Sequence, residues 1–231
     1  MKSFVTAIIV AAGNSTRMGL GYSKQFIPLL GEPVIKHTLM AFERSEIIDS
    51  VVVVCRPQDE DDIRGVIESA GISKVKALVH GGKERDESVR NGISAADSRT
   101  EYFAIHDGAR PLVSGRDIEN VVQAAFECGA AALGALVTDT IKTVDSENTI
   151  IGTPDRDTLR AVQTPQVFEK GLYLRALENA ADKALKVTDD CKLVESIGES
   201  VKIVISLDPN IKLTTKSDII FAQAILKERT E

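Results

Sequence analysis

The chain has 231 residues and a formal net charge of −6, and its 43% hydrophobic content is enough for one α/β domain of ordinary size. The acidic balance, the lack of Trp and an aromatic content of only 4% argue against a nucleic-acid partner, which needs a basic face and stacking platforms. We also expect no membrane association, because no run approaches the roughly 18 apolar residues of a membrane-spanning helix and no cleavable signal is visible. The three cysteines are widely separated, which excludes a zinc knuckle or disulfide framework and favours a reducing, cytoplasmic location.

Apolar runs alternate with helical patterns along the chain. We expect strands at six short β-prone segments, Val5–Ala11, Ser50–Cys55, Val75–Val79, Tyr102–His106, Ala131–Val137 and Val201–Ile205. We expect helices at seven periodic segments, Val34–Arg44, Gln58–Ser69, Glu84–Ala96, Gly115–Cys128, Lys170–Ala184, Asp189–Ser196 and Lys216–Glu228. This alternation predicts an α/β fold with a Rossmann-like, mostly parallel sheet flanked by helices, and residues 1–231 form a single domain in this interpretation.

Residues 139–162 break the alternation. Short β-prone runs flank the polar turn Asp145–Asn148, which predicts a protruding β-hairpin arm instead of another crossover helix. A two-stranded hairpin is marginally stable alone in water. We therefore expect the arm to pack on a second subunit.

The first strand runs directly into a small-residue loop, Ala11-Ala12-Gly13-Asn14-Ser15, and two cations follow it, Arg17 and Lys24. Small residues let backbone N–H groups approach phosphate oxygens, and the cations can neutralise a phosphate chain. The loop is neither a P-loop nor a dinucleotide fingerprint. Solvated surface cations are the alternative interpretation of Arg17 and Lys24.

Polar residues follow four other apolar runs, where the carboxyl ends of parallel strands place ligands. These residues are Gly81–Arg85 with Ser88, Asp107 with Arg110, Asp139 with Thr140, and Asn210 with Lys212. Each has a structural alternative: the Gly81–Gly82 pair can be a plain turn, and Asp107 can cap a loop. Thr188-Asp189-Asp190 can be a helix cap, and Thr164-Pro165-Gln166 an extended turn.

Several cations, one carboxylate suited to Mg²⁺ and backbone cradles favour phosphoryl or nucleotidyl transfer, in which positioning and charge stabilisation dominate. A phosphate monoester has a second pKa of about 6, so it is mostly dianionic at neutral pH and needs no general base. The lack of an obvious base therefore favours a phosphate acceptor over a sugar hydroxyl.

The motifs Ala11–Gly19, Lys24-Gln25-Phe26, Gly81–Val89, His106–Pro111, Asp139-Thr140, Thr164–Gln166, Thr188–Asp190 and Asn210–Lys212 occur in this order along the chain. In this order the chain resembles the family of 2-C-methyl-D-erythritol 4-phosphate cytidylyltransferases, among the sugar-phosphate nucleotidyltransferases. The resemblance implies that CMP passes from CTP to 2-C-methyl-D-erythritol 4-phosphate, with release of pyrophosphate and with Mg²⁺ as cofactor.

The resemblance also implies roles for individual residues. The CTP phosphates would lie in the loop formed by Ala11, Ala12, Gly13, Asn14 and Ser15. The residues that recognise cytosine would be Gly82, Lys83 and Ser88. The catalytic cations would be Arg17, Lys24 and Lys212, and the ligand of Mg²⁺ would be Asp107.

The acceptor phosphate would meet residues from two subunits of a homodimer. Its own subunit would contribute Arg110, Thr164 and Thr188. The arm of the neighbouring subunit would contribute Thr140 and Arg156.

Two alternatives stay open at this point. A sister family that makes CDP-ribitol from ribitol 5-phosphate shares the fold and most motifs, and the segments after Thr188 and Asn210 have some of its character. The chain could also be a nucleotide-binding regulatory domain that transfers nothing, since a fold does not fix a function.

Overall fold

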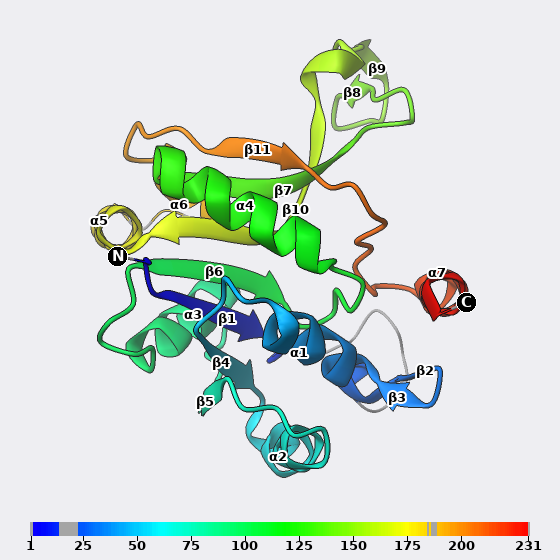
Figure 1. Ribbon diagram of the computed structural model, residues 1–231. Helices are drawn as coiled ribbons and strands as arrows, with labels where there is room; N and C mark the ends of the chain where they lie inside the picture. Colours follow the sequence, from blue (N-terminus) through cyan, green and yellow to red (C-terminus); the bar gives the residue numbers. More distant parts are fainter. Residues whose placement is uncertain (1, 14–22, 184, 186–188, 231) are drawn as a thin grey trace.

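The protein is described by a computed structural model that covers residues 2–13, 23–183, 185 and 189–230. Within these residues a seven-stranded sheet runs through the molecule in the order β11-β7-β10-β6-β1-β4-β5 (Figure 1). The strands are β1 (Val5–Val10), β4 (Ser50–Cys55), β5 (Val75–His80), β6 (Tyr102–Asp107), β7 (Ala130–Leu136), β10 (Arg160–Glu169) and β11 (Lys202–Ile205).

Six of the seven strands are parallel to one another in direction, and β10 runs against both of its neighbours, β6 and β7. The predicted mostly parallel sheet is confirmed, and all six predicted strands are present with small shifts at their ends. The central strands β1 and β4 are buried on both faces, in agreement with their mostly apolar sequences.

Helices cover both faces of the sheet (Figure 1). One face packs on α1 (Val34–Arg44), α2 (Glu60–Ser69) and α4 (Gly115–Cys128), and it receives Ile9 and Val53. The other packs on α3 (Arg85–Ser94), α5 (Lys170–Asp182) and α6 (Asp190–Glu195), and it receives Ile8 and Val52. Adjacent strand residues thus serve opposite layers, because successive strand side chains alternate between faces.

The last helix, α7 (Lys216–Thr230), packs on a smaller cluster beside the sheet. That cluster holds β2 (Pro28–Leu29), which pairs with β3 (Glu32–Pro33). Three short 3₁₀ helices complete the described elements: η2 (Lys24–Phe26), η3 (Pro57–Asp59) and η4 (Arg156–Thr158). All seven predicted helices are present, with the ends of five of them shifted by one or a few residues.

The strand β10 is missing from the sequence-based prediction, which treated Thr164–Gln166 as a possible turn and extended the arm to Val162. The structure corrects both points, since a ten-residue strand begins at Arg160 and lies near the centre of the sheet. Polar residues and Pro165 interrupt its apolar pattern, and a Pro ordinarily argues against a central strand. A register shift between Val162 and Gln166 accommodates this interruption.

The arm is confirmed as a hairpin of β8 (Thr143–Val144) and β9 (Ile150–Gly152), which protrudes from the ends of β7 and β10 (Figure 1). Asp145 shapes its turn, because the carboxylate accepts hydrogen bonds from the N–H groups of Glu147 and Thr149, both at 2.9 Å. Two apolar side chains of the arm, Ile150 and Ile151, are about 60% exposed or more.

None of the described helices is both long and apolar enough to cross a membrane.

Substitution of Ala for two helical glycines should have opposite effects on stability. A Cβ at Gly92 would lie 2.6 Å from Ile8 and 2.8 Å from Val54, so α3 touches the sheet there. Gly92→Ala should lower the free energy of unfolding by about 1–3 kcal/mol through overpacking. Gly65 in α2 has open space around it, and Gly65→Ala should raise the free energy of unfolding by about 1 kcal/mol.

Urea unfolding followed by circular dichroism checks both substitutions in parallel. Equal effects of the two would show that α3 does not approach the sheet as closely as described.

Candidate active site

Asp107 ends β6 at the carboxyl edge of the sheet and is only 8% exposed. One of its oxygens, Oδ2, lies 2.8 Å from Lys212 Nζ and 3.3 Å from Arg110 Nε. The other, Oδ1, lies 4.0 Å from Arg85 Nε. Burial opposes ionisation, but Lys212, Arg85 and Arg110 outweigh it and hold the pKa of Asp107 well below its usual range. The carboxylate therefore stays ionised at any physiological pH.

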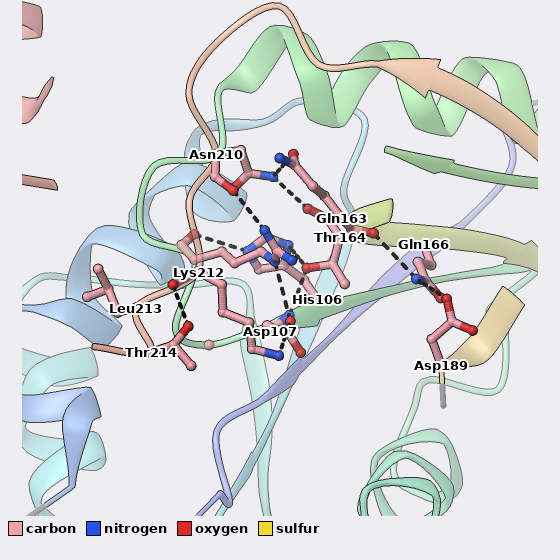
Figure 2. A network of polar contacts seen from close by, with 12 residues as sticks. His106, Asp107, Gln163, Thr164, Gln166, Asp189, Asn210, Lys212, Leu213 and Thr214 are labelled. Carbon is pink, nitrogen blue, oxygen red and sulfur yellow. Dashed lines mark hydrogen bonds and ion pairs between the residues drawn. The ribbon is translucent and has the colours of Figure 1, made fainter. Parts of the chain in front are cut away.

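A chain of buried hydrogen bonds holds the backbone N–H of Asp107 in place (Figure 2). The backbone N–H of Asp107 donates to Thr164 Oγ1 at 3.1 Å, and that hydroxyl lies 3.1 Å from His106 Nδ1. His106 Nε2 lies 3.2 Å from the carbonyl oxygen of Arg110, which can only accept a hydrogen bond. The Nε2 atom therefore carries the proton of a neutral imidazole, and Nδ1 accepts the hydroxyl proton of Thr164.

Burial lowers the pKa of His106 to about 4, which agrees with this neutral state. His106 thus orients the loop after β6 and is not placed as an acid or base. Thr164, predicted to line the acceptor site, is 4% exposed, and its hydroxyl is occupied by Asp107 and His106.

The irregular part of β10 is tied to the segment before α7. Asn210 Nδ2 donates to the carbonyl oxygen of Thr164 at 2.8 Å and to Gln163 Oε1 at 3.2 Å (Figure 2). Arg110 donates from one terminal nitrogen to the carbonyl oxygen of Asn210 at 2.8 Å. Arg110 is therefore buried and partly committed to structure.

The two predicted lysines Lys24 and Lys212 come from segments far apart in sequence. Lys24 Nζ donates to the carbonyl oxygen of Leu213 at 3.3 Å, and the Leu213 N–H donates to the carbonyl oxygen of Ala109 at 2.9 Å. The 3₁₀ helix of Lys24, the loop after Asp107 and the segment of Lys212 thus form one cluster. The structure thus brings Lys24 close to the segment of Lys212, and the third predicted cation, Arg17, lies outside the described residues.

The predicted nucleotide loops meet at Gly81. A Cβ there would lie 2.3 Å from the Ala12 side chain, so no larger residue fits between the loop after β5 and the loop after β1. Ser88 Oγ accepts from the Gly82 N–H at 3.1 Å and donates to the carbonyl oxygen of Glu84 at 3.0 Å. The Lys83 N–H donates to Glu87 at 2.7 Å. Side chains from the first turns of α3 therefore hold in place the turn that is proposed to bind cytosine.

Some predicted residues fall elsewhere. Asn14, Ser15, Arg17 and Thr188 lie outside the described residues. Thr140 and Arg156 are exposed on the arm, where Arg156 donates to the carbonyl oxygen of Thr138 at 2.9 Å. The structure thus groups Ala11, Ala12 and Gly13 with the other loops at the sheet edge, and it leaves the two arm residues apart from that cluster (Figure 1).

Sequence reasoning did not assign Arg85 or Asp190, although the structure places an ion pair between them beside Asp107. It also did not assign Gln166, which donates to Asp189 at 3.1 Å and accepts from the Cys191 N–H at 3.1 Å. The available signal for Arg85 was its position at the start of α3, directly after the Gly81–Glu84 turn.

An α/β sheet whose carboxyl edge gathers one lysine and two arginines around an ionised carboxylate, beside small-residue loops, suits the chemistry of a nucleotidyltransferase. A family model described as 2-C-methyl-D-erythritol 4-phosphate cytidylyltransferase matches residues 5–228. The chain belongs to this family.

Individual relatives agree. Proteins of that name from Alkaliphilus metalliredigens and Geobacillus thermodenitrificans are 41% and 45% identical to the chain, over 100% and 96% of it and 96% and 97% of their own lengths. The solved structure of 4-diphosphocytidyl-2C-methyl-D-erythritol synthase from Anaerococcus prevotii superposes with a TM-score of 0.88 at 34% identity. The superposition covers 98% of this chain and 97% of the Anaerococcus prevotii chain.

The buried His106 predicts an acid-sensitive stability. Its pKa is lowered from 6.5 to about 4 in the folded protein, so the unfolded chain binds the extra proton between these values. Stability from this group is complete above about pH 6.5 and falls as the pH drops toward 4, by about 3 kcal/mol in all. Urea midpoints in metal-free buffers across this range measure the loss.

His106→Gln is the matched variant, because the amide can still donate to the carbonyl of Arg110 but does not titrate. Its stability should change much less over the same pH range. Parallel pH curves for the two proteins would assign the acid sensitivity to other groups.

Proposed function

We propose that this chain transfers the CMP group of CTP to 2-C-methyl-D-erythritol 4-phosphate. A phosphate oxygen of the acceptor attacks the α-phosphorus of CTP while the bond to the β-phosphate oxygen breaks. The products are 4-diphosphocytidyl-2-C-methyl-D-erythritol and pyrophosphate. The single observation that carries the proposal is the family match over residues 5–228. The cluster of Lys24, Lys212 and Asp107 supports it independently.

Charge stabilisation is the main task of the site in this reaction. The acceptor phosphate is mostly dianionic at neutral pH, so it is already a nucleophile and requires no general base. Negative charge grows on the oxygens around the α-phosphorus as the bonds exchange. Lys24 and Lys212 are held by the backbone and by Asp107, and we assign them, with Arg17, to this charge.

Asp107 suits a Mg²⁺ ligand. Mg²⁺ sites in nucleotide enzymes combine one or two carboxylates with substrate phosphates, and no group of three or more acidic, His or Cys ligands occurs in the described part of the chain. Asp107 Oδ1 faces Arg85 at 4.0 Å and has no hydrogen bond within the described residues. When bound, Mg²⁺ would neutralise the CTP phosphates and orient them for in-line attack.

The nucleotide is assigned to the two loops that meet at Gly81. Ala11, Ala12 and Gly13, continued by Asn14 and Ser15, would donate backbone N–H groups to the triphosphate. Gly82, Lys83 and Ser88 would read the cytosine edge. Support comes from the contact of Gly81 with Ala12, which fixes the base loop against the phosphate loop.

The acceptor is assigned to Arg110 and Thr188, together with Thr140 and Arg156 from the arm of a second copy. Thr164 would support this site through its hydrogen bond to Asp107 and not by contact with the acceptor. The arm supports a homodimer, because its exposed apolar side chains Ile150 and Ile151 need a partner surface and its two short strands cannot be stable alone. We also assign the protein to the cytoplasm, which agrees with its three unpaired cysteines.

A substrate panel tests the activity. CTP, UTP, ATP and GTP are each combined with methylerythritol 4-phosphate or ribitol 5-phosphate and Mg²⁺, and pyrophosphate release is measured. We expect release only with CTP and methylerythritol 4-phosphate, and a drop in kcat of roughly 10²–10³ for the Lys24→Ala control.

Preference for ribitol 5-phosphate would assign the chain to the sister activity. Binding of CTP without pyrophosphate release from any acceptor would identify a regulatory domain.

Subunit mixing tests the composite site. Arg156→Ala should raise the KM of the acceptor and leave CTP binding nearly unchanged, because the Arg fork suits a phosphate. At an acceptor concentration well below the raised KM, Arg156→Ala and Lys24→Ala dimers, dissociated and reassembled together, should regain roughly a quarter of the wild-type rate, since half of the dimers are mixed and each has one intact site.

Lys24→Ala mixed with Lys24→Ala is the control and should stay inactive. Verified mixed dimers without recovered activity would show that Arg156 does not act across the interface.

A further inference from the structure

Asp190, in the first turn of α6, is a fully buried carboxylate that shares the cation Arg85 with the proposed metal ligand. It is 1% exposed and contacts two other helices. Tyr173 of α5 donates its hydroxyl proton to Asp190 Oδ1 at 2.6 Å. Arg85 of α3 forms an ion pair with Asp190 Oδ2, also at 2.6 Å.

Arg85 lies between two carboxylates and is closer to one of them. Its terminal nitrogen is 2.6 Å from Asp190, whereas its Nε is 4.0 Å from Asp107 Oδ1. Burial works against the charge of Arg85, but the attraction of Asp190 and Asp107 outweighs it and raises its pKa. Because attraction between charges grows as distance shrinks, Asp190 holds the guanidinium more firmly than Asp107 does.

The position of Arg85, closer to Asp190 than to Asp107, decides what Asp107 can bind. Its Oδ2 already contacts Lys212 and Arg110. If Arg85 moved onto Oδ1 in the two-pronged geometry that Arg adopts with carboxylates, both oxygens would be occupied by cations. A metal ion would then have to displace an Arg.

We propose that Asp190 is a positioning residue that restrains Arg85 and so keeps Asp107 Oδ1 available to Mg²⁺. The inference rests on the proposed role of Asp107 as the metal ligand. It differs from a structural role, in which Asp190 only joins α3, α5 and α6, because a structural role predicts a loss of stability and no specific effect on the metal.

The readout is the metal dependence of nucleotide binding, without turnover. Calorimetry gives the Kd of the α,β-methylene analogue of CTP with EDTA and with saturating Mg²⁺, and the ratio of the two Kd values measures the coupling between metal and nucleotide. Direct contacts between Arg85 and the nucleotide affect both Kd values and cancel in the ratio.

Asp190→Asn should lower this ratio by roughly 10- to 100-fold, the usual effect of losing a residue that supports a metal ligand. Adding Arg85→Gln to that variant removes the competing cation and should restore the ratio to near the wild-type value. Tyr173→Phe is the matched control: it disturbs the same buried carboxylate without changing its charge, so it should lower the melting temperature and leave the ratio unchanged.

Arg85→Gln alone provides an independent variant if Asp190→Asn does not fold. It should keep the ratio at or above the wild-type value, and a fall would overturn the inference. An unchanged ratio in Asp190→Asn, or a ratio that the double variant does not restore, would overturn it as well.

Asp107→Asn tests the metal ligand separately from the role of Asp190. It should abolish the coupling between metal and nucleotide. If it does so while Asp190→Asn has no effect, only the role of Asp190 is wrong. If Asp107→Asn leaves the coupling intact, the proposed metal ligand itself is wrong.

Discussion

The structure around the site depends on one buried negative charge. The Asp107 carboxylate is removed from water at the end of β6, and a lone charge in that position would be strongly unfavourable. Three cations compensate for it: Arg110 comes from its own loop, whereas Arg85 from α3 and Lys212 from the segment before α7 come from segments that are distant in sequence. The same attraction that stabilises the carboxylate therefore assembles the site from parts of the chain that are remote in sequence.

In the proposed reaction, this arrangement also prepares the cations for charge stabilisation. A lysine held by a carboxylate and by backbone carbonyls loses little freedom when a phosphate arrives, so its interaction with the transition state costs little reorganisation. Lys24 is held in this way by the carbonyl oxygen of Leu213, and Lys212 by Asp107. A substrate phosphate competes with those partners, which favours binding of the highly charged species over weakly charged analogues.

Local patterns were sufficient to predict most of the fold. The unbroken apolar run of β4 and the amphipathic periods of α1 and α4 are set by neighbouring residues, and their bounds agree with the structure. The strand β10 was not predictable in this way, because its polar centre satisfies its hydrogen bonds through Asn210 and the loop after β6, which are remote in sequence.

The same reason separates the predicted from the unpredicted parts of the site. Lys24, Asp107 and Lys212 follow recognisable motifs and strand ends, so their residue types were informative. Asp190 follows a motif that is equally typical of a helix cap, and its neighbour Asp189 does cap α6. Only the packing of α6 against α3 reveals that Asp190 faces Arg85.

One of the two strands that extend into the arm, β10, also supplies the site's supporting hydrogen bonds. β10 leaves the arm at Arg160 and, a few residues later, presents Thr164, whose hydroxyl accepts the N–H of Asp107. A displacement of the arm therefore reaches, along the backbone of β10, the Thr164 hydroxyl that holds the N–H of Asp107. In the proposed dimer, subunit contacts and active-site alignment both depend on this strand, so a substitution at the base of the arm would act on both.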